Sequence, residues 1–557
     1  MAQSDSAPHA GALSFRFQCG PVQERPKVTA DRRADTILTT ANVITVDTGV
    51  PRDPAVAVRD GRIAAVGSAA DALALRGPGT QVLDLADATV LPGFIDAHIH
   101  PIAAGVLHAT AADCDLPSIA AVLNALRTHA AARPAAHWVQ GFKFDDTKTA
   151  ERRFLTRTDL DSVSADRPVF VSHRAGHVYF ANSRALELVG YTEDSPDPPG
   201  GRLGRDPATG RLNSVLYERA RDPIKRYLPA ESDETRRAGL RLMQRRLAAA
   251  GITSAHDVMA TAGYLDAYRN ARDSGDLTLR VYCIMHRDHM AALPDARGRA
   301  GHGDDWVRTG AVKLVSDGAI AARTAYVSES YAGTDDHGIL AMSPEETLEW
   351  VTKIHRAGPQ VCTHANGDRA IKIVLDAYEK AQAAFPRPDP RFRIEHCTIV
   401  DSEILRRMKS LGAIATPFCT YVHHHGEKMR FFGAERLERM FAHRSFLDYG
   451  TVSTGASDYP PGPYEPLIGI QSCVTRTDSE GNLWGPSQRI TVEEAIRIYT
   501  LHGAFASVEE RLKGSITPGK LADLVVLATD PTLADPSTIK DIPVLRTIVG
   551  GKTVYEA

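Results

Sequence analysis

Two histidines separated by a single residue close an apolar stretch, residues 91–101. Side chains of a β-strand alternate between its two faces, so His98 and His100 point the same way if this stretch is a strand. Neutral imidazole nitrogens are good ligands for zinc and similar divalent ions. The carboxyl ends of the strands are also where α/β-barrel enzymes place their catalytic groups. The stretch therefore predicts part of a metal site at the end of a strand.

Lys313 interrupts an otherwise apolar run, residues 311–318. A lysine is rarely buried without a partner, and burial lowers its pKa towards that of a neutral amine. A neutral amine can combine with carbon dioxide to give a carbamate, whose two oxygens can bridge two metal ions. The alternative is a lysine that pairs with Asp317 or reaches solvent at the strand end. The histidines elsewhere in the chain favour the carbamate.

His364, His396 and Asp458 each end an apolar run as well. Taken singly, each histidine is readily explained as a hydrogen-bonded residue of the core or rim, and Asp458 as the N-cap of a following helix. Pro460 and Pro461 argue against a helix that starts immediately. A carboxylate that contacts both a metal ion and a water can accept the water's proton and deliver it to a leaving group.

Apolar β-like runs alternate with amphipathic helical stretches, such as residues 344–357 and 368–384, and this alternation predicts βα units around a parallel sheet. After the strand that begins at Leu91, we expect strands at residues 253–256, 279–285, 312–316, 360–364, 392–396, 413–416 and 451–458. Eight such strands predict the α/β class and a (β/α)8 TIM barrel over residues 91–510. All the candidate ligands then lie at one end of it.

The two ends of the chain are typical of short strands and tight turns. Residues 56–66 place Asp-Gly between two β-like runs, and residues 544–554 predict a hairpin over Gly550 and Gly551. We expect residues 34–90 and 511–557 to form one small β-sandwich domain from both termini. Residues 102–250 interrupt the barrel after its first strand and predict an inserted subdomain or lid. Residues 1–33 are interpreted as a flexible or partner-contacting extension.

Composition narrows the class of protein. The 557 residues carry a formal net charge of -3, with 43% hydrophobic and 24% charged residues, which favours a soluble protein and small-molecule partners over nucleic acid or a membrane. The seven cysteines are scattered and never form a Cys-x-x-Cys pair, so the spacing indicates neither a disulfide framework nor a thiolate zinc site. A reducing, cytoplasmic location fits best.

The motifs Gly-Phe-Ile-Asp-Ala-His-Ile-His-Pro, Val-Lys-Leu-Val-Ser-Asp-Gly, Thr-His-Ala-Asn-Gly-Asp-Arg-Ala, Ile-Glu-His and Gly-Ala-Ser-Asp-Tyr-Pro follow one another along the chain. A C-terminal signature, Gly-Ser-Ile-Thr-Pro-Gly-Lys-Leu-Ala-Asp-Leu-Val-Val-Leu, comes after them. Together they resemble the metal-dependent amidohydrolase superfamily, and more narrowly its amidohydrolase 3 branch, which includes N-substituted formamide deformylase-like enzymes. The match runs from about Ala34 to Val554.

The resemblance implies a set of metal ligands and their roles. One ion would be held by His98, His100 and Asp458 and another by His364 and His396, with the carbamate of Lys313 between them. Zinc is the default ion, although manganese, iron, cobalt or nickel would suit the same donors, and some relatives use one ion only. The relatives also lead us to expect a homodimer or homotetramer.

Several further residues are candidates for the same site. Asp458, Lys313 and His177 are predicted to be catalytic, and His177, His424 and Asp317 to contact substrate; His177 would do so from the inserted lid. We interpret His423 to His425 as a loop near the barrel mouth. Glu395, Asn366 and Asp368 could orient ligands, although caps and turns explain them equally well. Cys362 and Cys397 are interpreted as packing residues.

The predicted function is hydrolysis of a C–N bond in an amide, formamide or related small molecule, with Asp458 as the proton shuttle. Within the same fold, the alternatives are hydrolysis of a cyclic amide, carbamate or ester, or a non-hydrolytic reaction such as decarboxylation or isomerisation. A binding or scaffold protein that has lost catalysis is a third class. The complete ligand set argues against it.

Overall fold

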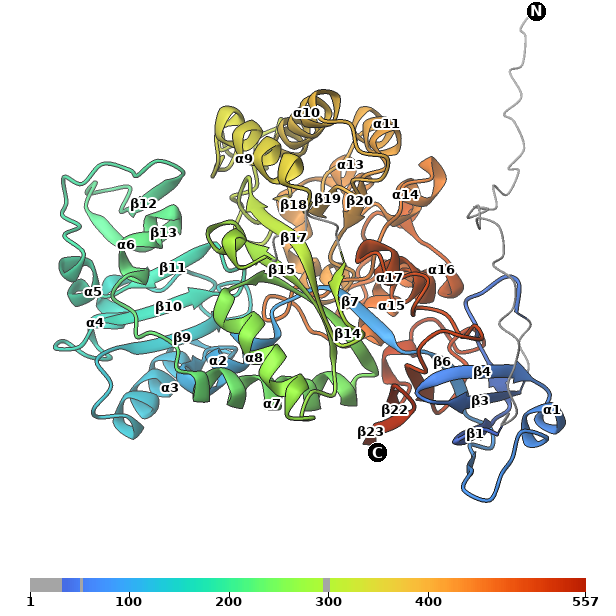
Figure 1. The fold of residues 1–557 in the computed structure, drawn as a ribbon. Helices are drawn as coiled ribbons and strands as arrows, with labels where there is room; N and C mark the ends of the chain where they lie inside the picture. Colours follow the sequence, from blue (N-terminus) through green and yellow to red (C-terminus); the bar gives the residue numbers. More distant parts are fainter. Residues whose placement is uncertain (1–32, 51–53, 294–300) are drawn as a thin grey trace, which may run out of the picture.

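The computed structural model describes residues 33–50, 54–293 and 301–557, so residues 1–32 of the predicted N-terminal extension lie outside the described residues. Seven parallel strands form a curved sheet at the centre of the molecule (Figure 1). In sheet order these strands are β20 (Ile414–Thr416), β19 (Arg393–His396), β18 (Gln360–Ala365), β17 (Val307–Val315), β15 (Arg280–His286), β14 (Ile252–Ala260) and β7 (Phe94–Ile99). The predicted α/β class and a nearly closed parallel barrel are thereby confirmed.

The eighth expected strand, residues 451–458, is where the prediction was wrong. This segment does lie between β20 and β7, but it forms a single parallel bridge, Ala415 to Ser453. On its other side, the Ala97 amide donates to Gly455 O at 3.0 Å, and the Asp458 amide donates to His98 O at 2.8 Å. The segment ends at Asp458, whose φ of 53° lies outside the range of a regular strand. It closes the barrel through irregular backbone contacts instead.

The first predicted strand divides at Gly93. Residues before it form β6 (Thr89–Pro92) in a sheet outside the barrel, and residues after it form β7. A Cβ at Gly93 would lie 2.2 Å from Thr253 Cγ2, so only glycine allows the chain to pass this close to β14. His100 falls just beyond β7 and precedes helix α2 (Pro101–Thr110).

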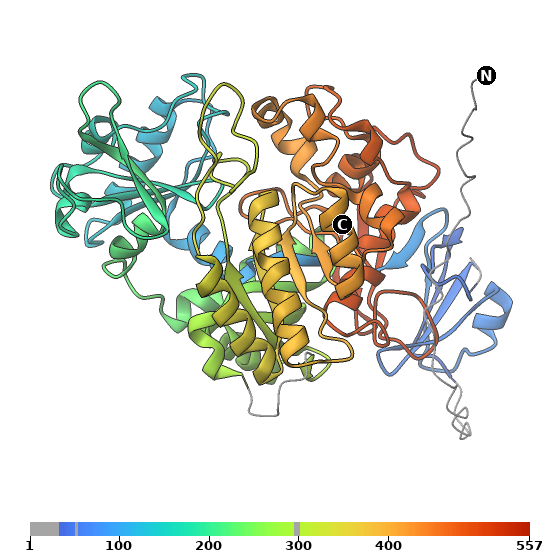
Figure 2. The ribbon, with the colours of Figure 1, turned by 90° about the horizontal axis from the view of Figure 1, so that it is seen from above.

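Helices cover the outside of the barrel between successive strands (Figure 2). α9 (Pro344–Ala357) starts where the Ser343 side chain accepts a hydrogen bond from the Glu346 amide, and it ends at Gly358 with a φ of 105°. Its buried face is spaced at helical intervals, as predicted, and packs beside α10 (Asp368–Ala384). α8 (Ala262–Asp273) and α11 (Ser402–Leu411) occupy equivalent places after β14 and β19.

The chain over residues 417–523 has helices as its regular elements. It contains α12 (Tyr421–His425), η3 (Gly426–Phe431), α13 (Ala434–Leu437), α14 (His443–Tyr449), α15 (Pro466–Thr475), η4 (Pro486–Gln488), α16 (Val492–Ile498) and α17 (Leu501–Ala506). The predicted loop at His423 to His425 is therefore a short helix. On a helix, consecutive side chains point in different directions, so the three histidines have different surroundings.

The inserted region between β7 and β14 forms its own sheet. Its six strands, in sheet order, are β12 (Gly201–Arg205), β13 (Leu212–Glu218), β11 (Val178–Ala181), β10 (Val169–His173), β9 (Val139–Phe144) and β8 (Ala112–Asp113). Helices α2, α3 (Ile119–Ala132), α4 (Arg157–Asp161), α5 (Ser183–Leu188), α6 (Asp222–Lys225) and α7 (Asp233–Ala249) accompany them. The apolar cluster of this sheet includes Ala319 and Ala322, which follow barrel strand β17.

Both ends of the chain contribute to two further sheets, which lie on the opposite side of the barrel from the inserted sheet (Figure 1). One has the order β4 (Arg62–Gly67), β3 (Ala55–Arg59), β1 (Thr36–Thr39), β5 (Gln81–Asp84). The other has the order β2 (Asn42–Val43), β6, β21 (Leu524–Leu527), β22 (Val544–Val549), β23 (Lys552–Glu556). Side chains from both sheets share one apolar cluster. The two predicted hairpins, β3–β4 and β22–β23, are confirmed.

A buried ion pair joins these terminal strands to the barrel. Arg280, at the start of β15, donates from Nε to Asp523 Oδ2 at 2.6 Å and from Nη2 to Asp523 Oδ1 at 2.9 Å. Both side chains are at most 5% exposed. Asp523 Oδ1 also accepts from the Gly550 amide, so one carboxylate holds β15, β21 and the β22–β23 turn together.

We predict that Asp523→Ala lowers the apparent free energy of unfolding by about 3–5 kcal/mol, because it leaves the Arg280 charge buried and unpaired. Asp541→Ala is the matched control, since Asp541 pairs with Lys540 while 64% exposed. It should cost less than about 1 kcal/mol. Urea unfolding followed by circular dichroism measures both, and equal shifts in the two variants would contradict the assignment.

Candidate active site

Three of the predicted ligands meet at the end of β7. His98 Nε2 lies 3.3 Å from Asp458 Oδ1, and His100 Nε2 lies 2.9 Å from the same oxygen. One ligand atom from each of the three side chains falls within 4.8 Å of the others. His98 is 1% and Asp458 9% exposed, so the carboxylate lies in a largely water-free place. Two imidazoles and a carboxylate in this arrangement can hold a divalent metal ion.

The far nitrogens of both histidines are fixed by other strands. His98 Nδ1 lies 2.5 Å from Glu395 Oε2, and His100 Nδ1 lies 2.6 Å from Val258 O. Because a carboxylate and a carbonyl accept hydrogen bonds, each Nδ1 carries a proton. When Nε2 gives up its own proton, its lone pair is directed towards the Asp458 oxygen and is available to a metal ion. Glu395 is itself held by Arg393, at 2.8 Å between Nε and Oε1.

Three more histidines continue the group. Ring centroids are 4.7 Å apart for His98 and His396, 4.3 Å for His396 and His364, and 4.8 Å for His364 and His177. His396 Nδ1 is buried with no hydrogen-bond partner, which is costly for a polar atom unless another ligand takes its place. His364 Nε2, by contrast, lies 3.0 Å from Gly318 O.

Burial sets the protonation of these groups. It lowers the pKa of His396 well below the ordinary value, and the nearby His364 and His98 lower it further. Burial likewise lowers the pKa of His364. Burial alone would raise the pKa of Asp458, but the imidazoles of His98 and His100 outweigh it and hold that pKa below its usual range. Burial alone would lower the pKa of His100, but the hydrogen bond and the negative charge of Asp458 outweigh it and raise that pKa. Metal binding requires neutral imidazoles and an ionised carboxylate, so an ion bound here would displace the proton that His100 shares with Asp458.

Lys313 lies on β17, 2% exposed. Burial lowers its pKa to about 8, against the opposing charges of Glu395 and Asp458. The alternative pairing with Asp317 is not seen among the described residues. Asp317 instead accepts backbone hydrogen bonds from Asn366, Tyr326 and Gly367, each at 2.9 Å.

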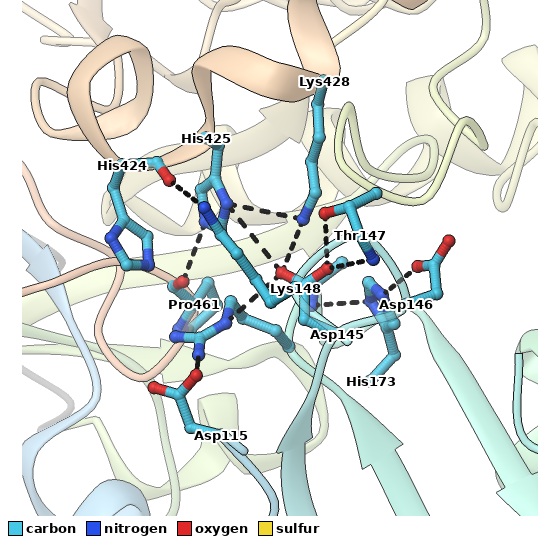
Figure 3. Close-up of polar contacts among 12 residues, drawn as sticks. Asp115, Asp145, Asp146, Thr147, Lys148, His173, His424, His425, Lys428 and Pro461 are labelled. Atoms are coloured by element: carbon cyan, nitrogen blue, oxygen red, sulfur yellow. Dashed lines mark hydrogen bonds and ion pairs between the residues drawn. The ribbon is translucent and has the colours of Figure 1, made fainter. Parts of the chain in front are cut away.

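Two predicted substrate contacts lie away from the cavity beside these histidines. Asp317 is fully buried under the loops that it binds and does not line the cavity. His424 does not line it either, whereas its neighbour His425 does. Figure 3 shows His425 inside a polar cluster, with Nε2 3.1 Å from Pro461 O and Nδ1 3.4 Å from Lys428 Nζ. Both ring nitrogens are thus engaged, and His425 offers the cavity its ring.

The cavity beside these histidines is partly open to solvent. Apart from glycine, its lining combines polar residues of the site with a larger set of apolar and aromatic ones. The polar and ionisable members are His177, His364, Asn366, His396, Thr420, His425 and Asp458, and the others are Ala175, Ala319, Ile320, Ala321, Phe418, Tyr421, Phe441 and Pro461. No lysine, arginine or glutamate of the described chain is among them.

His177 reaches this cavity from the inserted sheet. Its Nδ1 lies 2.7 Å from Glu218 Oε2, and Glu218 Oε1 accepts from Thr324 Oγ1 at 2.8 Å. Sequence reasoning did not identify Glu218. Its one local signal is a carboxylate at the end of a strand, β13, because its partner His177 lies far away in sequence, in the turn before β11 of the same insert.

Comparisons with known proteins identify the family of this chain. Residues 81–555 match the model of the amidohydrolase family (Amidohydro_3). The chain is 32% identical to the N-substituted formamide deformylase of Arthrobacter pascens, over 94% of this chain and 98% of that protein. It is 30% identical to the putative amidohydrolase YtcJ of Bacillus subtilis (strain 168), over 91% of this chain and 96% of that protein.

Among solved structures, an uncharacterized metal-dependent hydrolase from Pyrococcus horikoshii OT3 superposes with a TM-score of 0.71 at 22% identity, over 90% of this chain and 99% of that one. This similarity shows a shared fold. The chain belongs to the amidohydrolase family, as its motifs predicted. It is therefore a hydrolase that acts on carbon–nitrogen bonds other than peptide bonds. In the described residues, every helix is too short or too polar to cross a membrane.

The low pKa of Lys313 makes a prediction about stability. Between pH 8 and about 10.4, the unfolded chain binds a proton at this lysine that the folded chain does not, so folding gains stability as pH rises. In metal-free, carbon dioxide-depleted buffer, the stability of the wild type relative to Lys313→Met should rise by about 3 kcal/mol across this window. Urea unfolding at several pH values measures it.

The exposed Lys353 provides the control, because Lys353→Met should follow the wild type at every pH. Parallel curves for the wild type and Lys313→Met would contradict a low Lys313 pKa.

Proposed function

We propose that this protein is a metal-dependent amidohydrolase that cleaves the C–N bond of an uncharged amide or formamide. The observation that carries the proposal is the buried group of His98, His100 and Asp458, of which Asp458 lines a cavity. The alternative of a scaffold without catalysis is not favoured, because it gives no reason to keep the Asp458 carboxylate buried against the Nε2 atoms of two histidines.

The donor set fits a divalent ion. His98, His100 and Asp458 would hold one ion, His364 and His396 a second, and a carbamate on Lys313 would lie between them. The unpartnered Nδ1 of His396 supports the second position, since an ion would satisfy this buried atom. Nitrogen and oxygen donors suit zinc and also manganese, iron, cobalt or nickel. When bound, such an ion supplies Lewis acidity and lowers the pKa of a bound water towards ~7.

The chain's own residues supply proton transfer and orientation. Asp458 lines the cavity and is ionised, so it can accept a proton from an attacking water and return it to the leaving nitrogen. Glu395 and Val258 keep His98 and His100 in the tautomer that leaves Nε2 free. His177, whose Nδ1 faces Glu218, can donate from Nε2 to the substrate carbonyl when the ring carries both protons, as an imidazolium paired with Glu218.

The Lys313 carbamate is proposed on chemical grounds. Its neutral amine would add to carbon dioxide, forming an N–C bond and releasing one proton, and the anionic product would suit a place between two cations. A pKa of about 8 leaves a substantial fraction of neutral amine near neutral pH, which an ordinary lysine does not have.

The inserted region is proposed to act as a lid. Ala175 and His177 of the insert line the cavity directly. Beside them, Lys428 Nζ lies 2.7 Å from Asp145 Oδ2, and Lys148 Nζ donates to His424 O at 2.8 Å (Figure 3). These contacts join the insert to the helices after β20 over the cavity. The apolar lining of the cavity favours an uncharged substrate with a hydrophobic N-substituent.

We predict that Asp458→Asn lowers kcat by about 10²–10⁴-fold, because the amide cannot accept the proton. Hydrolysis of N-formyl and N-acyl amines, lactams and aryl esters is followed by product formation, and metal content is measured in the same samples. Asp541→Asn is a surface control that should retain full activity. Wild-type turnover by metal-replete Asp458→Asn would contradict the proton-transfer role, and unreduced activity of metal-stripped wild type would contradict the proposed function.

We also predict that Glu395→Gln weakens metal binding by about 10–100-fold, because His98 loses the carboxylate that fixes its tautomer. Competition with a chelator measures the affinity, and circular dichroism checks folding. Glu403→Gln on the exposed side of α11 is the matched control and should bind metal like the wild type. Equal affinities in all three proteins would rule out this role for Glu395.

A further inference from the structure

A second group of metal-ligating side chains lies in the core, apart from the candidate active site. It consists of Cys419 just after β20, His443 at the start of α14 and Cys473 on α15. All three are at most 3% exposed. One ligand atom of each falls within 4.8 Å of the other two. Two sulfur donors of one tetrahedral zinc ion, each bonded at ~2.3 Å, lie about 3.8 Å apart, which falls within this limit.

His443 is oriented towards the thiols. Its Nδ1 lies 2.8 Å from Ser453 Oγ, and its Nε2 lies 3.5 Å from Cys419 Sγ. A metal-ligating histidine is usually fixed in this way, with one ring nitrogen held by a neighbouring oxygen and the other facing the ion. α14, α15 and the turn after β20 meet at this point, and each of them contributes one of the three side chains.

A buried hydroxyl lies beside these three side chains. The Tyr499 hydroxyl lies in the core next to Cys419, and Cys419 is its one neighbour for hydrogen bonding among the described residues. Two glycines make room for it: a Cβ at Gly469 would lie 2.0 Å from its Oη, and one at Gly455 would lie 2.4 Å from its ring. The chain thus keeps an oxygen beside the thiols, where it can serve as a further donor to a bound ion.

The charges also suit a divalent cation. Two thiolates with one divalent ion form a neutral unit, which is the form that a fully buried site requires. The cysteines are far apart in sequence and lack a Cys-x-x-Cys spacing, so the fold alone brings them together.

We propose that Cys419, Cys473 and His443 bind a structural zinc ion, with Tyr499 Oη in the fourth position. This site is separate from the proposed catalytic centre and does not depend on that function. The bound ion ties the turn after β20 to α14 and α15. Phe418 belongs to this turn, and its ring centroid lies 4.6 Å from that of His396 and 6.4 Å from that of His98. The zinc ion therefore holds one wall of the substrate cavity in place.

Cobalt tests the site, because a thiolate bound to cobalt gives a charge-transfer absorption that nitrogen and oxygen ligands do not. The full chain is produced in cobalt-supplemented medium, and its spectrum and cobalt content are measured. We expect the band in the wild type, with loss of the band and of about one cobalt per chain in both Cys419→Ala and Cys473→Ala. Cys114→Ala removes a buried cysteine of the inserted region and should keep the band. Asp458→Asn should also keep it, whatever happens to hydrolysis.

A wild type without the band, or a band that survives in either cysteine variant, would overturn the proposal. If the alanine variants do not fold, X-ray absorption at the cobalt edge of the wild type decides the question. About two sulfur neighbours on one ion support the site, and their absence overturns it.

Discussion

The structure of the candidate site depends on one constraint, the burial of an ionised carboxylate beside two histidine rings. Asp458 would be unstable in the barrel without the two histidine Nε2 atoms that face it. Those atoms face it only because Glu395 and Val258 hold the opposite ring nitrogens. Thus β7, β14 and β19 all supply groups that hold the Asp458 carboxylate or its two histidines in place, and the irregular segment before Asp458 supplies the carboxylate itself. A bound cation would complete this arrangement.

Local sequence patterns identified the candidate ligands that lie at the ends of strands. His98, His364 and His396 follow apolar runs whose β character is visible in the sequence, and strand ends in a parallel barrel converge. The irregular path of residues 451–458 could not be predicted, because it depends on hydrogen bonds to β7 and β20 and on the positive φ of Asp458. The helix at His423 to His425 was missed because it has only five residues.

Pairings between distant segments were equally invisible. Glu218 contacts His177 from a neighbouring strand of the insert, and nothing in its own surroundings announces that contact. The cysteines illustrate the same limit more strongly. Their spacing argued against a thiolate metal site, yet Cys419 and Cys473 meet in the folded chain beside His443. Spacing motifs detect sites built by one hairpin or turn, whereas this group is assembled from separate helices and a loop.

The inserted sheet and the helices after β20 both contribute residues to the cavity beside the carboxylate. They approach each other through Asp145 and Lys428 and enclose a cavity whose walls are mostly apolar. Hydrolysis of a C–N bond, the reaction of the family, is thus proposed to take place in a pocket suited to an uncharged molecule. Specificity would reside in Phe418, Tyr421 and Phe441, which line the cavity but are not among the candidate metal ligands.

The most direct test of the central claim is a crystal structure of the zinc-replete protein with anomalous scattering recorded above and below the zinc edge. The account predicts an anomalous peak within bonding distance of His98, His100 and Asp458, at ~2.0–2.2 Å from their ligand atoms. A zinc-replete crystal with ordered His98, His100 and Asp458 side chains and no peak between them would contradict it.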